Sequence, residues 1–449
     1  MPRSTTLFVC QQCAARYAKW SGRCDNCGAW NSLVEEVAAP TKKAVVDRSA
    51  GRRLETADLK TVSAEADDKR LSTGLKEFDE VLGGGLVPGS VSLLAGQPGI
   101  GKSTLLMQVT GNLGRTQPVL YVSGEESSAQ VAGRAKRLGV AGSAKQLELS
   151  ASTSADDIAA TIASGDYRVV VVDSMQTLSL AEVASAPGTV SQITNSANII
   201  IRAAKAAKTA VILVGHVTKE GSVAGPKVLE HLVDVVLGFE GDRYGGLKLL
   251  RAAKNRYGST AEVALFDMDD TGLKSVDNPS ASLLKERSDA DGSVILATME
   301  GNRPLLVEIQ ALVNPTSFGY PKRTASGFDL NRLNVLVAVL EKRTKLKLSD
   351  KDIFINVVGG LKLQDPAADL AVAMAIASAS AGRRLDDGLV VFGEIGLGGE
   401  VRSVRSLDAR VKEAKKLGFK SAIGPQSGKQ ATFVSSVVDL RQALIKHLN

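Results

Sequence analysis

The chain has 449 residues, of which 44% are hydrophobic and 23% charged, and its net charge is +7. This length allows two to four domains of about 100 to 200 residues, and the apolar content excludes a disordered chain. No apolar stretch reaches the roughly 18 residues of a membrane span and no signal sequence opens the chain, so we expect a globular cytoplasmic protein without membrane contact. The mild positive charge suits a polyanionic partner, but it is equally compatible with an ordinary solvated surface.

All four cysteines lie within the first 30 residues. Cys10 and Cys13 form one C-x-x-C pair, and Cys24 and Cys27 form a second. Two such pairs around a short loop bring four thiolates to one tetrahedral ion. Two disulfides are the alternative, which the missing secretory signal disfavours. Since so short a segment has almost no core, a bound metal must supply its folding free energy, and we predict a structural zinc finger over residues 1–36.

Residues 37–70 are polar and rich in charge, without periodicity, and are therefore predicted to be a linker. From Leu71 onward, short apolar runs alternate with amphipathic stretches. This pattern is typical of an α/β fold whose parallel sheet is covered by helices on both faces, and we expect this domain to span residues 71–277. The predicted strands are 91–95, 119–123, 169–173 and 210–215, and the predicted helices include 127–138 and 197–208.

A glycine-rich segment follows the first of these strands and precedes a helix-like run. Its spacing fits the phosphate-binding pattern G-x-x-x-x-G-K-[ST], in which backbone N–H groups close around phosphates, the lysine reaches the β and γ oxygens, and the hydroxyl binds Mg²⁺. The helix N-terminus would add its dipole. The predicted nucleotide-binding residues are Gly96, Gln97, Pro98, Gly99, Ile100, Gly101, Lys102, Ser103 and Thr104.

Acidic residues follow two other predicted strands. Asp173 ends the run Val169–Val172, where a carboxylate next to the phosphate loop would help Ser103 to hold Mg²⁺, although it could equally cap the next helix. Glu125 and Glu126 follow the strand 119–123. One of them could orient and polarise the attacking water. Acidic residues that simply begin a helix are the alternative.

The composition changes again between residues 277 and 291, where a second domain boundary is predicted. The remaining part, 291–449, combines expected strands with expected helices and indicates a separate α+β domain. The expected strands are 294–299, 305–313 and 354–358, and the expected helices are 333–340 and 367–379.

Several short motifs together carry a resemblance to known proteins. Residues 71–75 with Phe78 and Asp79, the acidic segment 123–126 and the run 215–219 resemble the RecA/DnaB class of P-loop ATPases. With the cysteine pairs and the pentad Lys-Asn-Arg-Tyr-Gly at 254–258, nearly the whole chain resembles the bacterial RadA (Sms) family of DNA repair proteins. That family usually has phenylalanine at the fourth place of the pentad, where this chain has Tyr257.

The resemblance implies an ATP-hydrolysing motor that uses ATP, Mg²⁺ and Zn²⁺. It would assemble as a hexameric ring, bind single-stranded DNA and drive branch migration of recombination intermediates alongside a RecA recombinase. Glu125 would be the catalytic glutamate, with Glu126 as the alternative, and His216 would sense the γ-phosphate. Lys254 and Arg256 would act on the nucleotide of the neighbouring subunit, where a cation stabilises transition-state charge. By composition alone they read as a solvated basic turn.

RecA-like proteins carry DNA-binding loops after the strands that correspond to 169–173 and 210–215. Here these positions are occupied by residues 185–192 and 219–227. Lys219, Lys227 and Arg243 are therefore predicted to contact DNA phosphates, with plain surface charges as the alternative. Aromatic residues make up only 4% of the chain, so base stacking is expected to contribute little.

The C-terminal part resembles the proteolytic domain of Lon, as this family's does. The position of the Lon serine is Ala367, and the position of its lysine is Arg410. Alanine has no nucleophile and arginine cannot release its proton, so we expect a domain without proteolytic activity. An ATP-dependent protease and a KaiC-like ATP-binding scaffold remain alternative functions, which DNA-stimulated hydrolysis would separate from a motor.

Overall fold

The computed structural model describes residues 6–30, 32–37, 56, 58, 70–216, 228–241, 247–287, 289–317, 319–426 and 428–448. By its internal contacts the chain divides into two compact units. The first comprises Met1–Glu240, Leu249–Thr260 and Met268–Lys274, and the second comprises Gly241–Lys248, Ala261–Asp267 and Ser275–Asn449. Among the described helices, none is both long enough and apolar enough to cross a membrane.

The N-terminal segment forms a small antiparallel sheet with the strand order β2-β1-β3. Its strands are β1 (Thr6–Cys10), β2 (Arg16–Tyr17) and β3 (Leu33–Val37). Its buried cluster contains little more than Cys10, Cys24 and Leu33. A core of this size cannot stabilise a fold by burial alone, which agrees with the prediction that this segment depends on a metal.

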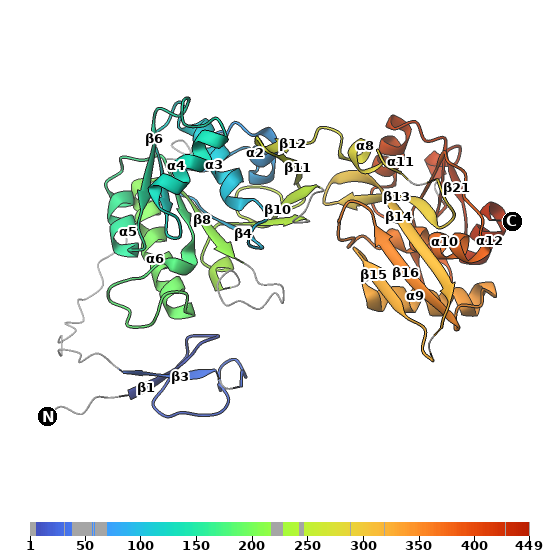
Figure 1. Cartoon of the computed structure of the whole chain (residues 1–449), viewed down its shortest axis with the longest axis horizontal. Coiled ribbons are helices and arrows are strands. Elements are labelled where there is room, and N and C mark those ends of the chain that lie inside the picture. Colours follow the sequence, from blue (N-terminus) through green and yellow to red (C-terminus); the bar gives the residue numbers. More distant parts are fainter. Residues whose placement is uncertain are drawn as a thin grey trace. The chain divides into compact units, whose positions relative to one another are not determined.

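A nine-stranded sheet with the order β12-β11-β10-β9-β4-β8-β7-β5-β6 follows (Figure 1). The neighbouring strands from β9 to β6 pair in parallel. The strands are β4 (Val91–Gly96), β5 (Val119–Ser123), β6 (Leu147–Ala151), β7 (Val169–Asp173), β8 (Ala210–His216), β9 (Val235–Gly241), β10 (Lys248–Asn255), β11 (Val263–Asp269) and β12 (Gly272–Ser275).

Helices alternate with the parallel strands, as the sequence predicts. They are α2 (Lys76–Leu82), α3 (Lys102–Leu113), α4 (Ser128–Arg137), α5 (Ala155–Ala163) and α6 (Val190–Ala207), with a short 3-10 turn, η1 (Met175–Thr177), after β7. Hydroxyl side chains cap three of them: Ser127 accepts from Gln130 N, Ser154 from Asp157 N and Thr189 from Gln192 N. These caps satisfy backbone donors that the first turn of a helix leaves free.

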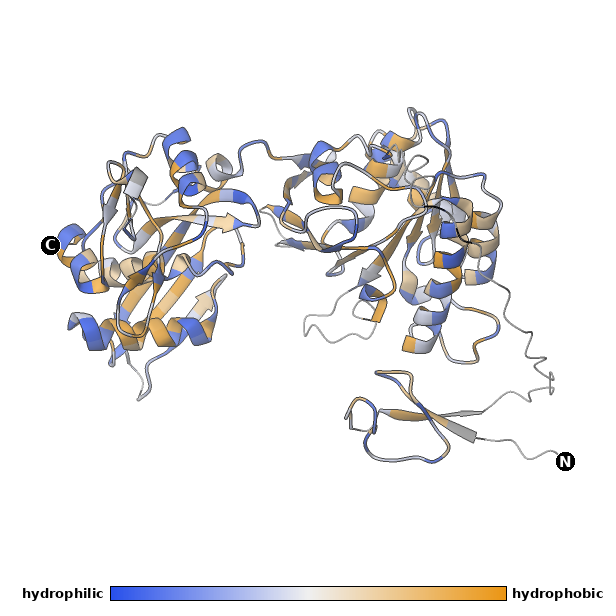
Figure 2. Cartoon of the chain, turned by 180° about the vertical axis from the view of Figure 1, so that it is seen from behind, coloured by the Kyte–Doolittle hydropathy of each residue, from blue (hydrophilic) through white to orange (hydrophobic). Residues whose placement is uncertain are grey.

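Burial explains the shape of this domain. The four valines of β7 are completely buried, and α5 and α6 pack together over the same face of the sheet. Figure 2 shows hydrophobic strands inside and hydrophilic residues on the outer surfaces of the helices. Strands that are buried on both faces read as continuous apolar runs, which is why the sequence indicates them so clearly.

The structure adds elements that the sequence-based expectation lacks, among them α5 and the strands β9 to β12, and it moves the start of one helix. The structure adds β6 at the sheet edge, where partial exposure breaks the apolar pattern of residues 147–151. Helix α6 begins at Val190, seven residues before the predicted start at Ala197. Residues 190–192 of the expected loop 185–192 therefore belong to a helix, and Gln192 is buried rather than available to DNA.

The C-terminal part contains a seven-stranded sheet with the order β15-β16-β14-β13-β17-β20-β21 and a separate two-stranded ribbon, β18-β19. Its strands are β13 (Ser293–Glu300), β14 (Arg303–Pro315), β15 (Arg323–Ser326), β16 (Lys351–Val357), β17 (Leu389–Val391), β18 (Glu394–Ile395), β19 (Val401–Arg402), β20 (Ser421–Gly424) and β21 (Val434–Ser436). Its helices are α8 (Pro279–Leu283), α9 (Leu330–Thr344), α10 (Ala368–Ala381), α11 (Leu407–Lys416) and α12 (Leu440–His447), with the 3-10 turn η2 (Gly428–Gln430).

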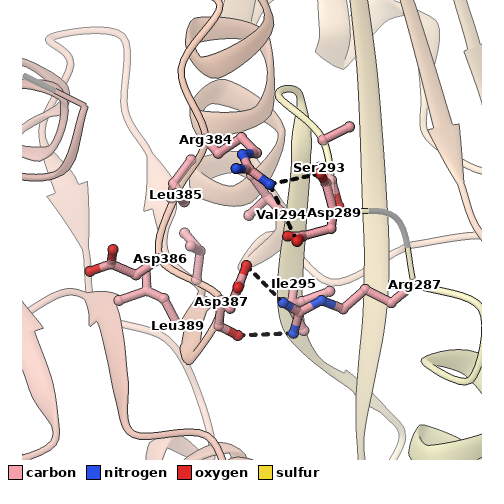
Figure 3. Close-up of a pocket in the computed structure, with 12 residues that line it drawn as sticks. Arg287, Asp289, Ser293, Val294, Ile295, Arg384, Leu385, Asp386, Asp387 and Leu389 are labelled. Carbon is pink, nitrogen blue, oxygen red and sulfur yellow. Dashed lines mark hydrogen bonds and ion pairs between the residues drawn. The ribbon is translucent and has the colours of Figure 1, made fainter.

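Two ion pairs join the start of this domain to the segment after α10 (Figure 3). Arg287 reaches Asp387 with an N–O distance of 3.1 Å, and Arg384 reaches Asp289 at 3.3 Å. Each arginine also donates to the backbone carbonyl of its partner residue. The two arginines that line the small pocket between these segments are therefore already paired, and their ion pairs hold the segments together.

Candidate active site and metal centre

The phosphate-loop segment connects the end of β4 to the start of α3. A Cβ atom at Gly96 would lie 2.5 Å from the carbonyl oxygen of Phe239, so only glycine fits there. Gly99 and Gly101 have φ angles of +78° and +112°, in the left-handed region that favours glycine. At Gly99 an added Cβ would meet no described atom within 4 Å, so the loop presents an open cradle.

The first turn of α3 is suited to an anion. No side chain caps this helix, and no acidic residue occupies its first turn. Its N–H groups can therefore bind phosphate, assisted by the helix dipole. Ser103 and Thr104 are half-buried in this turn. The donor set fits a nucleotide polyphosphate, as the glycine spacing predicts.

Lys102 is buried beneath this loop. Its Nζ donates to the carbonyl oxygens of Gly96 at 2.8 Å and Gln97 at 3.1 Å, and it lies 3.0 Å from Nδ1 of His216. Burial lowers the pKa of the Lys102 amine to about 8, although the charges of Asp173 and Glu125 oppose this effect. The amine is therefore held next to the phosphate position, and the nearby carboxylates do not fully offset the cost of burying its positive charge. A phosphate group that binds there would stabilise the charged amine.

A chain of polar contacts extends from Lys102 across the ends of the strands. A charged lysine can only donate, so Nδ1 of His216 is assigned as the acceptor and its Nε2 carries the proton. That Nε2 lies 3.3 Å from Oε1 of Glu125, which also accepts a 2.5 Å hydrogen bond from Ser174 Oγ. Burial and, second, the charge of Lys102 lower the pKa of His216, which keeps the ring neutral.

The two candidate glutamates have different surroundings. Both carboxylate oxygens of Glu126 bond to Arg134 of α4, at 2.5 and 2.6 Å. Glu125 instead contacts Ser174 and His216, in the same cluster as Lys102. The structure thus brings Glu125 to the phosphate loop and engages Glu126 in an ion pair at the start of the neighbouring helix.

Asp173 ends β7 with a buried side chain. Its Oδ2 accepts a 2.7 Å hydrogen bond from the hydroxyl of Tyr121 on β5. Burial, first of all, raises the pKa of Tyr121, so this phenol remains protonated and donates. The charge of Asp173 acts to raise the pKa of Lys102, and a carboxylate of this kind is the type of ligand that Mg²⁺ prefers.

Lys254 and Arg256 do not join this cluster. Lys254 Nζ donates to the carbonyl oxygens of Glu230 at 2.7 Å and Val233 at 2.8 Å. Arg256 pairs with the buried Asp234 at 3.1 Å, and Asp234 also accepts from the backbone N–H of Val91, the first residue of β4. Gly96 ends that six-residue strand, about 16 Å away at roughly 3.3 Å per residue. Both cations therefore lie near the ends of the strands that are opposite the phosphate loop of their own subunit.

The rest of the pentad packs against the end of α2. Arg70 donates to the carbonyl oxygens of Leu82 and Tyr257, and the backbones at Gly83 and Gly258 approach so closely that a Cβ on either would lie 3.0 to 3.1 Å from the other's Cα. Tyr257 takes part through its backbone here, so its difference from phenylalanine leaves this contact intact. The predicted DNA contacts Lys219, Lys227 and Arg243 lie outside the described residues.

The four cysteines form a compact sulfur cluster whose members lie within 4.8 Å of one another. The Sγ atoms of Cys10 and Cys27 are 3.6 Å apart, and those of Cys13 and Cys24 are 3.5 Å apart. Bonds of about 2.3 Å to a tetrahedral zinc ion require sulfurs about 3.8 Å apart. The residues therefore fit a structural zinc ion with four protein ligands, as the spacing predicts.

The two halves of this site have the same backbone construction. The N–H of Ala14 donates to Cys10 O, and the N–H of Gly28 donates to Cys24 O, both at 2.8 Å. Both residues have positive φ angles, +57° for Ala14 and +74° for Gly28. A hydrogen bond with the Tyr17 hydroxyl lowers the pKa of the Cys24 thiol to about 6, which favours the thiolate that binds metal.

The two Lon-type positions meet in the core of the C-terminal domain. Ala367 is fully buried, and its N–H donates to Oδ1 of Asp365. Arg410, whose side chain is 1% exposed, pairs with Oδ2 of Asp365 at 2.7 Å and donates to the carbonyl oxygens of Ala297 and Arg405. One carboxylate thus contacts both positions, and the arginine serves as a buried structural link.

Sequence reasoning missed Tyr121, Ser174 and Arg134, which contact the three acidic residues. Tyr121 lies among apolar residues in the run Val-Leu-Tyr-Val-Ser, and an aromatic residue in such a run is typically part of the core. Ser174 directly follows Asp173, and that adjacency was the one available signal. The contacts of Tyr121 and Ser174 depend on which strands are neighbours, and a single sequence does not give that order. Arg134 lies only eight residues after Glu126, so that contact depends on the local path of the chain into α4.

Comparison with known families matches three segments of the chain. Residues 54–222 match the family described as an AAA domain, residues 8–35 match a rubredoxin metal binding domain, and residues 331–428 match subunit ChlI of Mg-chelatase. These matches correspond to a RecA-like α/β ATPase core, an N-terminal four-cysteine metal site and a ChlI/Lon-like C-terminal domain. A crystal structure of a RadB recombinase is 22% identical to this chain. The match covers 46% of this chain and all of the RadB chain, with a TM-score of 0.37.

Relatives match over nearly the full length. The DNA repair protein RadA of Pseudomonas aeruginosa is 47% identical over 99% of both chains. The RadA proteins of Bacillus subtilis and Aquifex aeolicus are 46% and 44% identical; each alignment covers 95% of this chain and 93% and 95% of theirs, respectively. With this identity over all of its parts, the chain belongs to the RadA family of DNA repair proteins.

Proposed function

We propose that this protein is a DNA-dependent ATPase that drives branch migration of recombination intermediates. It binds single-stranded and branched DNA, acts alongside a RecA recombinase, and works as a homo-hexamer in the cytoplasm. The observation that carries the proposal is the contact chain Lys102–His216–Glu125–Ser174 next to the uncapped start of α3. It joins a phosphate-binding lysine to a carboxylate that can orient water.

The residues divide the work of hydrolysis as follows. Backbone N–H groups of Gly96–Thr104 and the ammonium of Lys102 bind the phosphates, and Ser103 and Asp173 would hold a Mg²⁺ ion, which would supply positive charge to the phosphates. Glu125 orients the attacking water and accepts its proton, because Ser174 and His216 fix its carboxylate. The ion pair with Arg134 keeps Glu126 out of this role.

The positions of Lys254 and Arg256 support a ring in which each subunit acts on the nucleotide of its neighbour. In this subunit they lie far from their own phosphate loop, and they are anchored next to Asp234 and the carbonyls before β9. When subunits pack side by side, this edge can face the strand ends of a neighbour. The two cations then stabilise charge on the neighbour's γ-phosphoryl group, so that hydrolysis requires assembly.

His216 supports a link between nucleotide and DNA. It ends β8, contacts both Lys102 and Glu125, and is followed directly by the segment that contains Lys219 and Lys227. A γ-phosphate that displaces the lysine from Nδ1 would change the contacts of the histidine. We infer that Lys219, Lys227 and, beyond β9, Arg243 contact DNA phosphates in a state-dependent way.

We infer the domain limits from the predicted linkers: a zinc finger at 1–36, a linker at 37–70, the ATPase at 71–277 and the ChlI/Lon-like domain at 291–449. The last of these does not cleave peptides, because Ala367 lacks a nucleophile and Arg410 remains protonated in its ion pair. ATP-stimulated cleavage of casein by the purified protein would contradict this inference.

The test combines ATP hydrolysis with movement of a branch. Wild-type protein should hydrolyse ATP faster with single-stranded DNA and should displace a strand from a three-stranded junction. Lys102→Ala should lose both activities and stay folded, since it removes a phosphate contact. Lys254→Ala should bind nucleotide normally but fail to resolve the junction. Hydrolysis at one rate with and without DNA would refute the motor, and equal strand displacement by Lys254→Ala would remove the pentad from it.

A further inference from the structure

Tyr121 has a buried hydroxyl that the roles above do not use. Its side chain is 1% exposed, in the middle of the strand β5. In the parallel pair β5–β7, Tyr121 lies opposite Val171 and Ser123 lies opposite Asp173. Side chains two residues apart along a strand share a face, so Tyr121 and Asp173 are on the same side of the sheet and the phenol can reach the carboxylate.

The contact is short and buried. The Tyr121 hydroxyl donates to Oδ2 of Asp173 at 2.7 Å. A phenylalanine of the same shape would fill the core equally well, whereas a buried phenol is favourable only when its O–H finds a partner. That partner is the carboxylate of Asp173, the last residue of β7. The hydroxyl therefore acts on the orientation of Asp173.

We propose that Tyr121 is a positioning residue for the Mg²⁺ ion of the nucleotide site. Its hydrogen bond fixes Oδ2 of Asp173, so that Oδ1 is the oxygen that would be directed to the ion. The inference rests on the proposed ATPase function and adds a residue to that site. Outer partners that orient a metal-binding carboxylate commonly change metal affinity by about 10- to 100-fold when removed.

The test is the variant Tyr121→Phe, which removes a single oxygen. Binding of a fluorescent ADP analogue is titrated with MgCl₂, and the Mg²⁺ concentration at half-maximal binding should rise about tenfold relative to wild type. Binding of the analogue in EDTA should stay unchanged, because Lys102 and the backbone cradle are intact. ATP hydrolysis at low Mg²⁺ should fall, and excess Mg²⁺ should restore most of it.

Tyr167→Phe is the matched control. The Tyr167 hydroxyl donates to Oε2 of Glu148 at 2.6 Å, and its partly buried ring packs against the core cluster that includes Leu120 and Val122 of β5. Glu148 belongs to β6, away from Asp173, so this variant also loses a tyrosine–carboxylate hydrogen bond but should leave the Mg²⁺ midpoint unchanged. Comparing the melting temperatures of the two variants separates general loss of stability from a specific effect on magnesium.

A double-mutant cycle sharpens the result. In an Asp173→Asn background, Tyr121→Phe should add little further change to the Mg²⁺ midpoint, because the group it orients is gone. Superimposed Mg²⁺ titrations of wild type and Tyr121→Phe would overturn this inference, and so would an equal shift in Tyr167→Phe. Wild-type protein that binds nucleotide without any dependence on Mg²⁺ would instead count against the proposed ATPase.

Discussion

Lys102 shows how a single side chain can be prepared for its ligand. Two backbone carbonyls and the imidazole of His216 hold its amine in place before any phosphate is present. Burial lowers its pKa to about 8, and a neighbouring phosphate would raise it again. Nucleotide binding and protonation of Lys102 are therefore linked.

The linkage predicts a pH dependence of nucleotide affinity. At pH 7.5 most Lys102 amines in the free protein are charged, whereas at pH 9 most are neutral and must take up a proton as phosphate binds. Affinity should therefore fall about tenfold between pH 7.5 and pH 9, as one coupled proton requires. Fluorescence titrations of an ATP analogue at several pH values, together with calorimetry in buffers of different ionisation enthalpy, measure the fall and the proton uptake.

Lys102→Arg supplies the comparison, since a guanidinium stays charged over this range. Its affinity, even if weaker overall, should be flat from pH 7.5 to pH 9. A wild-type affinity that is equally flat would show that Lys102 is already charged at pH 9 in the free protein, against the effect of its burial.

At this scale the sequence predicts the residues that belong to a local motif and misses those that meet across strands. The phosphate-loop residues Gly96 to Thr104 share one short segment, so their spacing alone identifies them. The choice between Glu125 and Glu126 depends on Arg134 and on Ser174 from another strand. That choice requires the order β8-β7-β5, which no local pattern contains.

The zinc finger illustrates the scale of single elements. Two similar turns, each closed by a residue in the left-handed region, present the four sulfurs. The second turn has Gly28 at this place, but the first has Ala14, for which this conformation costs roughly 1 kcal/mol more than for glycine. The sequence shows the cysteine spacing plainly, while the strained alanine becomes visible only from the backbone angles.

This asymmetry predicts opposite effects of two substitutions. Gly28→Ala should weaken zinc binding about tenfold, because it adds left-handed strain and brings a Cβ within 3.1 Å of the Arg23 guanidinium. Ala14→Gly should keep or improve zinc affinity. Since folding of this segment is coupled to the metal, competition with a chromogenic chelator measures both. Equal weakening by the two variants would show that the turns do not hold the metal in the way described.

At the scale of the whole molecule, the two basic residues proposed to act on a nucleotide lie far from the phosphate loop of their own subunit. Lys254 and Arg256 are anchored near the ends of the strands that are opposite the phosphate loop of their own subunit. The proposed ring would account for this placement, because each subunit could then complete the site of its neighbour. The sequence predicts these residues only through a family resemblance, since a basic turn has no distinctive pattern of its own.

Mixing inactive subunits tests this arrangement. Lys102→Ala subunits retain Lys254 and Arg256, and Lys254→Ala subunits retain an intact phosphate loop. If the sites are shared, an equimolar mixture should regain about a quarter of wild-type ATPase activity, as random assembly of a closed ring gives. Adding the double variant Lys102→Ala/Lys254→Ala to Lys102→Ala subunits should restore nothing. A first mixture that stays inactive, although mass measurement shows mixed rings, would contradict sharing.

The buried pair of Arg410 and Asp365 bears on the history of the C-terminal domain. The guanidinium reaches Asp365, Ala297 O and Arg405 O with three different nitrogens. A lysine carries its donors on a single nitrogen and so cannot reach three acceptors that are spaced to fit the guanidinium fork, and breaking a buried pair costs about 3 to 5 kcal/mol. Restoring a peptidase dyad would therefore first destabilise the scaffold that must carry it. In a lineage with this core, evolution back toward peptide cleavage is opposed by folding itself, before any question of chemistry arises.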